Sequence, residues 1–128
     1  MTVLVLDSGG LSRLSEQKQE NVALIAVLSR DGYWPPIVPS VVLAESISGR
    51  QHTDANTNRL LKRCDIVTEL PERVARRAGA LRSAAKRGSA VDAVVVAMAE
   101  PDGVVFGSDV GDLGALAAHA RNVRVQRA

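Results

Sequence analysis

Short apolar runs alternate along the chain with longer stretches in which apolar residues recur at helical spacing. Five runs are candidate strands: residues 3–6, 36–39, 66–68, 104–106 and 123–125. The first run is apolar throughout, as expected for a central strand that is buried on both faces, and the last is typical of an edge strand. Strands that alternate with helical stretches indicate parallel pairing. The pattern therefore predicts an α/β fold, a three-layer α/β/α sandwich around a central, mostly parallel five-stranded sheet.

The helices are predicted from caps and from the spacing of apolar residues. Ser15, Ser40 and Ser89 are candidate N-caps, because a serine side chain can accept a hydrogen bond from the first turn of a helix. Four apolar residues line one face of the stretch 71–87, and four arginines, at positions 73, 76, 77 and 87, are assigned to the opposite face. The predicted helices cover residues 15–30, 40–47, 56–62, 71–87, a stretch that begins after Ser89 and includes Met98, and 113–119.

Composition limits the classes of protein that the chain could belong to. Its 128 residues predict a single domain, 1–128, and the lone cysteine, Cys64, excludes an internal disulfide or a zinc site built from cysteines. No apolar run approaches the roughly 20 residues of a membrane span, and the N-terminus lacks the features of a signal peptide, so we expect a cytoplasmic protein with no membrane partner. The net charge of +2 is too small to indicate a nucleic-acid partner by itself. With three aromatic residues, binding of single strands by base stacking is not expected.

Four acidic residues stand apart from the others because they lie in or directly after apolar segments. Asp7 follows the first strand, Glu45 lies in the apolar stretch after the second, and Asp92 is embedded in the stretch 90–96. Asp109 follows the fourth strand, and Asp112 comes three residues later. Carboxylates are seldom buried unless they are paired or bind a metal ion. All except Glu45 also have an ordinary structural interpretation, as a turn acid for Asp7 or as helix-cap acids for Asp92, Asp109 and Asp112. A cap role does not reach as far into the predicted helix as Glu45.

The predicted positions of these acids agree with one another. Asp7 and Asp109 follow the carboxyl ends of two strands, which is where open α/β sheets place their sites. If the strand order reverses beside the first strand, Glu45 and Asp92 can reach the same cleft. Carboxylates so close together would repel one another unless a cation neutralised them, and an all-oxygen site favours Mg²⁺ or Mn²⁺ over zinc. Such a site can generate a hydroxide nucleophile and stabilise charge on a phosphate.

In their order and spacing, these residues resemble PIN domains. The matching segments are residues 4–8, Glu45 in its apolar stretch, residues 91–99 and residues 107–113, and the resemblance covers the whole chain. More narrowly, the chain is similar to the small ribonuclease toxins of bacterial VapBC toxin–antitoxin modules. One departure is that Gly107 stands where the family usually has threonine or serine, with Ser108 adjacent.

The resemblance implies a Mg²⁺-dependent endoribonuclease that acts as a toxin. Asp7, Glu45, Asp92 and Asp109 match the family's catalytic acidic quartet, and Asp112 matches a frequent fifth acid at the metal site. The supporting residue Ser8 matches a small hydroxyl residue that often follows the first aspartate. Metal-activated water would cleave an RNA phosphodiester and leave a 5′-phosphate and a 3′-hydroxyl.

The resemblance also implies partners. They are an RNA substrate, a second copy of the chain in a homodimer, and a cognate antitoxin whose basic C-terminal segment occupies the acidic cleft. Operator DNA would be bound only through the antitoxin.

Three other interpretations remain beside this one. An aspartate-nucleophile phosphatase needs a second aspartate two residues after the first, where this chain has Gly9. A phosphoacceptor receiver domain expects a lysine after a late strand, and none follows Phe106 closely. The third alternative is a catalytically silent PIN-fold module that acts by binding a partner.

Overall fold

The strands form one parallel sheet whose order reverses beside its central strand. The computed structural model describes residues 2–128. The strands are β1 (Leu4–Leu6), β2 (Ile37–Pro39), β3 (Asp65–Val67), β4 (Val104–Gly107) and β5 (Arg124–Arg127), in the order β3-β2-β1-β4-β5. Every neighbouring pair is parallel, and β1 lies between β2 and β4. The predicted fold class, the reversal beside the first strand and the edge position of the last strand are therefore confirmed.

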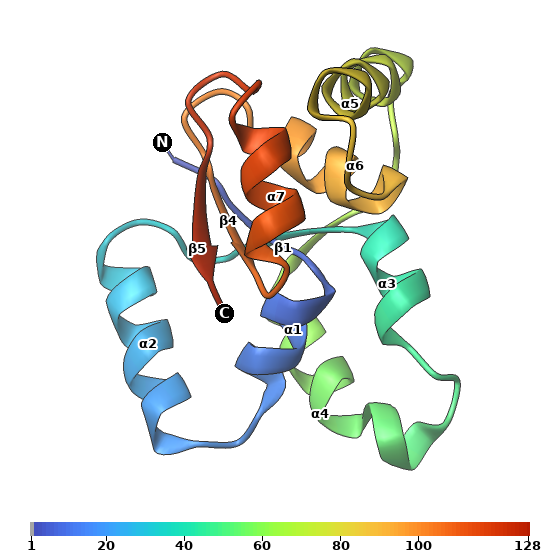
Figure 1. The fold of residues 1–128 in the computed structure, drawn as a ribbon. Coiled ribbons are helices and arrows are strands. Elements are labelled where there is room, and N and C mark those ends of the chain that lie inside the picture. The colour runs from blue at the N-terminus through green and yellow to red at the C-terminus, as the bar shows by residue number, and fades with distance from the viewer. Residues whose placement is uncertain (1) are drawn as a thin grey trace.

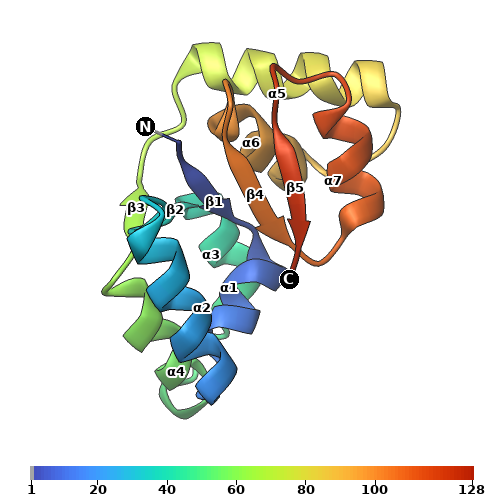
Figure 2. The same ribbon diagram turned by 90° about the vertical axis from the view of Figure 1, so that its left-hand side faces the viewer.

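Seven helices cover the sheet in the described part of the chain. They are α1 (Ser8–Ser15), α2 (Gln19–Arg30), α3 (Ser40–Ser46), α4 (Gln51–Leu61), α5 (Glu72–Ala85), α6 (Ala90–Ala99) and α7 (Val110–Ala117). Helices α5, α6 and α7 pack on one another beside β4 and β5, whereas α1 packs against α3 and α4 in the other half of the molecule (Figures 1 and 2). Within residues 2–128, no helix combines the length and the apolar character that crossing a membrane requires.

The core lies around the central strands and α6. All three residues of β1 are buried, as the apolar run predicts for a strand covered on both faces. Helix α6 is buried along most of its length because it packs against β1 and β4 on one side and α5 on the other. Strand β1 is thus buried under α6 and paired on both sides, with β2 and β4, and this fixes where the residues after its carboxyl end lie.

The start of the predicted helix at 15–30 is wrong, because Ser15 ends one helix and does not cap the next. Helix α1 starts directly after β1, and a separate helix α2 starts at Gln19. The side-chain amide of Asn21 donates to the carbonyl oxygens of Arg13 and Glu16, so it satisfies the backbone at the break between the two helices. Asn21 is the buried residue of α2. The connection after β1 thus holds two helices instead of a loop and one helix.

Four other helix boundaries differ from those predicted. Ser40 is the first residue of α3 and not its cap, because Pro39 occupies the N-cap position without a side-chain hydrogen bond. Helix α4 begins earlier, at Gln51, and α7 begins earlier, at Val110, because the side chain of Asp109 caps it. Helix α5 ends at Ala85, which leaves Arg87 in the loop before α6.

Candidate metal centre

Asp7 lies where β1 passes into α1, and its carboxylate caps that helix. The backbone N–H of Gly10 donates to Asp7 Oδ1 at 2.7 Å, and the residue is only 5% exposed. The same carboxylate lies against Gly107 at the end of β4, where an added Cβ would come within 2.5 Å of Asp7 Oδ2. A side chain at position 107 would therefore displace Asp7, which explains why glycine occupies this place.

Burial raises the pKa of Asp7 above its ordinary value. The N–H of Gly10 opposes this rise, and the nearby negative charge of Asp92 adds to it. The charge of Asp92 on α6 is therefore near enough to act on the carboxylate of Asp7, and a cation nearby would favour the charged form of that carboxylate.

Asp92 lies in the first turn of α6 and takes part in a reciprocal cap. Its backbone N–H donates to Ser89 Oγ at 3.0 Å, and the N–H of Ser89 donates to Asp92 Oδ2 at 3.2 Å. This capping box confirms the predicted N-cap at Ser89 and fixes the orientation of the carboxylate. The other carboxylate oxygen of Asp92, Oδ1, takes no part in the capping box.

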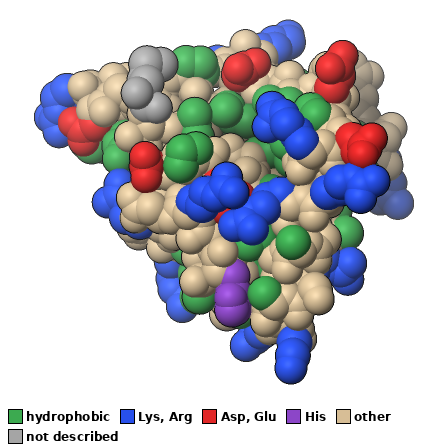
Figure 3. All heavy atoms as spheres, turned by 90° about the horizontal axis from the view of Figure 1, so that it is seen from above, with side chains coloured by type: hydrophobic (Ala, Val, Ile, Leu, Met, Phe, Trp, Pro, Cys, Tyr) green, Lys and Arg blue, Asp and Glu red, His purple; other side chains and the backbone are tan. Residues whose placement is uncertain are grey.

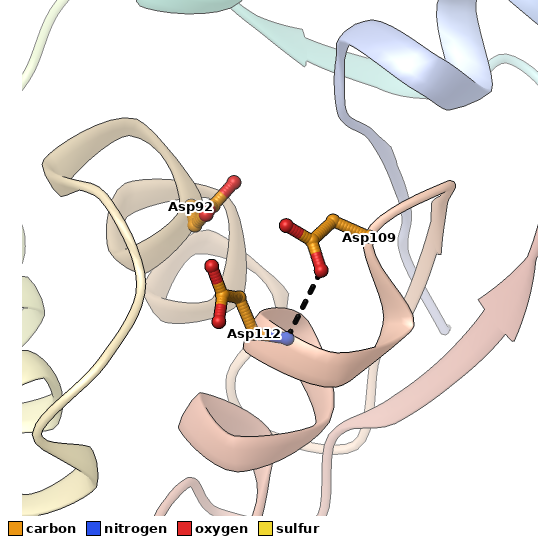
Figure 4. A group of neighbouring side chains, drawn as sticks. All are labelled: Asp92, Asp109 and Asp112. Atoms are coloured by element: carbon orange, nitrogen blue, oxygen red, sulfur yellow. Dashed lines mark hydrogen bonds between the residues drawn. The ribbon is translucent and has the colours of Figure 1, made fainter.

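Three of the predicted aspartates meet beside α6 and α7. One carboxylate oxygen each from Asp92, Asp109 and Asp112 lies within 4.8 Å of the others. Asp109 is the N-cap of α7 and accepts from the N–H of Asp112 at 3.2 Å, so the two α7 acids hold each other in place. Figure 4 shows the side chain from α6 and the two from α7 directed toward the same space. Asp92 and Asp112 are half-buried and Asp109 is exposed, so this aspartate cluster could hold a metal ion that solvent can reach.

Asp7, Glu45 and Ser8 lie outside the aspartate cluster. Glu45 is exposed on α3, a helix of seven residues of which Val42 is the buried one. Its apolar sequence neighbours therefore do not bury it. Ser8 is the half-buried first residue of α1, directly after Asp7.

Arg87 is the site residue that sequence reasoning missed. Its Nε donates to Asp112 Oδ1 at 2.7 Å, which makes an ion pair at the edge of the aspartate cluster. From the sequence, Arg87 could be recognised only as one of several arginines in the stretch 71–87. Its contact with Asp112 joins residues 25 positions apart, so no local pattern predicts it. The other arginines of that stretch do not form a continuous basic track: Arg76 pairs with Glu72 and Arg77 with Glu100. Figure 3 views the molecule from above and shows Lys and Arg side chains over that face, with acidic side chains among them.

Two further acids are buried for structural reasons. Asp54 is 4% exposed and accepts hydrogen bonds from the N–H groups of Ser48 and Gly49, which hold the pKa of its carboxyl below the ordinary value. Glu100, whose side chain is 6% exposed, accepts two hydrogen bonds from Arg77. Asp54 stands in a polar stretch of sequence, whereas Glu100 directly follows the apolar stretch of α6. Both are nevertheless buried by the hydrogen-bond partners that they meet in the fold.

Fold and site together define an α/β protein with a parallel sheet and a carboxylate cluster that could hold a metal ion beside the carboxyl ends of its strands. Comparison of the chain with models of protein families and with curated proteins found no match.

Proposed function

We propose that the chain is a Mg²⁺-dependent endoribonuclease of the PIN type, the toxin of a VapBC-like toxin–antitoxin module. The observation that carries the proposal is the convergence of Asp92, Asp109 and Asp112 within 4.8 Å, with Asp7 close to Asp92. Asp7 and Asp109 follow the carboxyl ends of β1 and β4, the two strands beside which the strand order reverses. Asp92 lies on α6, which packs on both strands, and Asp112 lies in the first turn of α7. Open α/β sheets place ligands at such points.

The donors present fit a hard divalent cation. Three carboxylates meet in the aspartate cluster and Asp7 lies near one of them, Asp92. Among the residues that the structure describes, no histidine or cysteine joins the cluster, and oxygen ligands suit Mg²⁺ or Mn²⁺ better than zinc. Asp7, Asp92, Asp109 and Asp112 are the residues that would hold the ion. A divalent cation in such a site would lower the pKa of a nearby water molecule and neutralise charge on a phosphate.

The protein's own contribution is positioning and access. Asp7 and Asp109 are oriented by the helices they cap, and Asp92 by its capping box with Ser89, so three carboxylates are fixed by backbone hydrogen bonds. Asp109 is exposed, which leaves the aspartate cluster open to a chain as large as RNA. We place Glu45 in the catalytic quartet on the resemblance to PIN domains. Its helix, α3, directly follows β2, so Glu45 comes after the carboxyl end of a strand, as Asp7 and Asp109 do.

The partners belong to the same proposal. An acidic cluster at the surface is complementary in charge to the basic C-terminal segment of an antitoxin, and we propose that such a segment occupies the cluster. Homodimerisation, and contact with operator DNA only through the antitoxin, are proposed on the resemblance to the toxin family.

The alternative, a catalytically silent module that binds a partner, is favoured by one observation. Arg87 already neutralises Asp112 in the protein, so the aspartate cluster has a structural explanation that needs no metal ion. Enzyme and silent module differ in whether RNA is cleaved, so a cleavage assay separates them.

The test is cleavage of RNA by the purified full-length chain with Mg²⁺ and with a chelator present. We expect cleavage only with the cation, products with 5′-phosphate and 3′-hydroxyl ends, and a loss of roughly 100-fold or more in Asp92→Asn and Asp109→Asn. Asp31→Asn is the matched control, because Asp31 is an exposed aspartate at the end of α2 and should leave the rate unchanged. Equal cleavage by all variants, or no cation-dependent cleavage by the wild type, would overturn the proposal.

A further inference from the structure

The loop between α5 and α6 directs one arginine at the aspartate cluster. Lys86 adopts a left-handed conformation with φ of 58°, and Gly88 has φ of 94°. These two reversals bring the chain from the end of α5 back to the start of α6, with Arg87 between them. The Arg87 side chain then crosses to the first turn of α7, where it meets Asp112.

The guanidinium of Arg87 occupies one of the two carboxylate oxygens of Asp112. Arg87 Nε lies 2.7 Å from Asp112 Oδ1, and Arg87 Nη2 lies only 3.1 Å from the place of an added Cβ at Gly111. That place is itself 3.7 Å from Asp109 Oδ1. The guanidinium therefore covers the first turn of α7 beside two of the three clustered carboxylates.

The charge balance of the aspartate cluster explains why an arginine stands there. Aspartates whose oxygens lie within 4.8 Å repel one another, and the single positive charge of Arg87 offsets part of that repulsion. The pair is not locked into the core, since the side chain of Arg87 is 56% exposed and that of Asp112 is 28% exposed. An exposed ion pair of this kind contributes little net stability, so its partner can be exchanged.

We propose that Arg87 is a resident counter-ion that a divalent cation displaces from Asp112. This inference rests on the proposed cation site. Without the cation, Arg87 neutralises Asp112 and holds its carboxylate toward α6. When the cation binds, the Arg87–Asp112 hydrogen bond breaks and the guanidinium turns into solvent. Arg87 thus lowers the affinity of the aspartate cluster for the cation, and it keeps the carboxylates in place while the cation is absent. Arg87 is therefore a positioning residue.

The test is the dissociation constant of Mn²⁺, measured by calorimetry on the metal-free full-length protein. Arg87→Gln removes the competing charge, and we expect roughly 3- to 10-fold tighter binding. Arg87→Lys keeps the charge and should bind within about twofold of the wild type. Arg76→Gln is the matched control, because Arg76 makes an ion pair of the same 2.7 Å length with Glu72 on the exposed side of α5. It should leave the dissociation constant unchanged.

A second readout follows the hydrogen bond itself. The Nε–H proton of Arg87 gives an NMR signal while it is bound to Asp112, and the signal is assigned by its absence in Arg87→Lys. Titration with diamagnetic Mg²⁺ should shift or broaden this signal, whereas that of Arg76 should stay in place.

The outcomes separate this inference from the proposed function. Wild-type binding of Mn²⁺ with unchanged affinity in Arg87→Gln, or weaker binding in that variant, overturns the inference and leaves the cation site standing. An unperturbed Arg87 signal at saturating Mg²⁺ does the same. No cation binding by any of the proteins overturns both the inference and the cation site.

Discussion

Replacing Asp92 with asparagine separates the structural role of this residue from its proposed role in binding a cation. The asparagine oxygen can still accept from the N–H of Ser89, so the capping box of α6 is retained. What is lost is one negative charge. That charge interacts favourably with the helix N-terminus and unfavourably with Asp109 and Asp112.

These two effects nearly cancel in the cation-free protein. A negative charge in the first turn of a helix contributes about 0.3–1 kcal/mol. Each like-charged pair 4.8 Å apart repels by about 0.9 kcal/mol in water, and Arg87 offsets the repulsion from Asp112, which leaves mainly the pair with Asp109. We therefore expect the free energy of unfolding of Asp92→Asn to lie within about 1 kcal/mol of the wild type when no divalent cation is present.

The difference between the proteins should appear when the cation is added. A ligand at 100 times its dissociation constant stabilises the folded state by about 2.7 kcal/mol. For a chain of this length, that corresponds to a rise of roughly 10 °C in Tm. Loss of one carboxylate ligand should weaken binding of the cation at least about tenfold. At the same cation concentration, the rise in Tm of the variant should then be at most about half that of the wild type.

The assay is thermal unfolding of wild type, Asp92→Asn and the control Asp31→Asn over a range of Mg²⁺ and Mn²⁺ concentrations. The control should follow the wild type, because Asp31 is an exposed residue at the end of α2. The reasoning is refuted if Asp92→Asn gains as much from the cation as the wild type does. A reduced gain in Asp31→Asn as well would show that the effect is a general one of surface charge.

Three further substitutions test other parts of the account. Burial raises the pKa of Asp7, so the folded state loses stability as the pH rises from the unfolded pKa of this residue through the raised folded one. Without divalent cations, Asp7→Asn should therefore be more stable than the wild type at pH 7. The difference, measured by urea unfolding, should vanish toward pH 4. Arg77 lowers the pKa of Glu100, which contributes stability above its unfolded pKa that is lost as the pH falls through the folded one. Glu100→Gln should therefore cost about 1–3 kcal/mol at pH 7 and less in acid, in the same measurement. Glu45→Gln should leave the free energy of unfolding within about 0.5 kcal/mol of the wild type, since Glu45 is exposed, and should lower RNA cleavage at least about tenfold; unchanged cleavage would remove Glu45 from the site.

The strands were predictable because the information for them is local. Continuous apolar runs mark β1 and β4, and each strand found lies within about two residues of the one expected. Helix α1 was missed because Gly9 and Gly10 are poor helix formers. The structure gives their reason: added Cβ atoms would collide with Ser108 and with the carbonyl group of Phe106 across the sheet. Only tertiary contacts reveal this requirement.

Within the site, the acids that cap helices were the predictable ones. Asp92 and Asp109 stand at spacings that caps require, so the sequence placed them at helix N-termini and hence near the ends of strands. Apolar neighbours gave a poorer indication for Glu45, because a short helix buries only one side and Glu45 lies on another. The ion pair of Arg87 with Asp112 depends on how the α5–α6 loop folds back, and no local pattern encodes it.

The most direct test of the central claim is to induce the wild-type chain and Asp92→Asn in bacteria and to map new RNA ends. The account predicts that the wild type arrests growth and produces discrete 5′-phosphate ends, whereas the variant accumulates to the same level and produces none. Those ends would also identify the RNA that is cleaved. Soluble wild-type protein without new ends, or the same ends from both proteins, would contradict the claim that this aspartate cluster cleaves RNA.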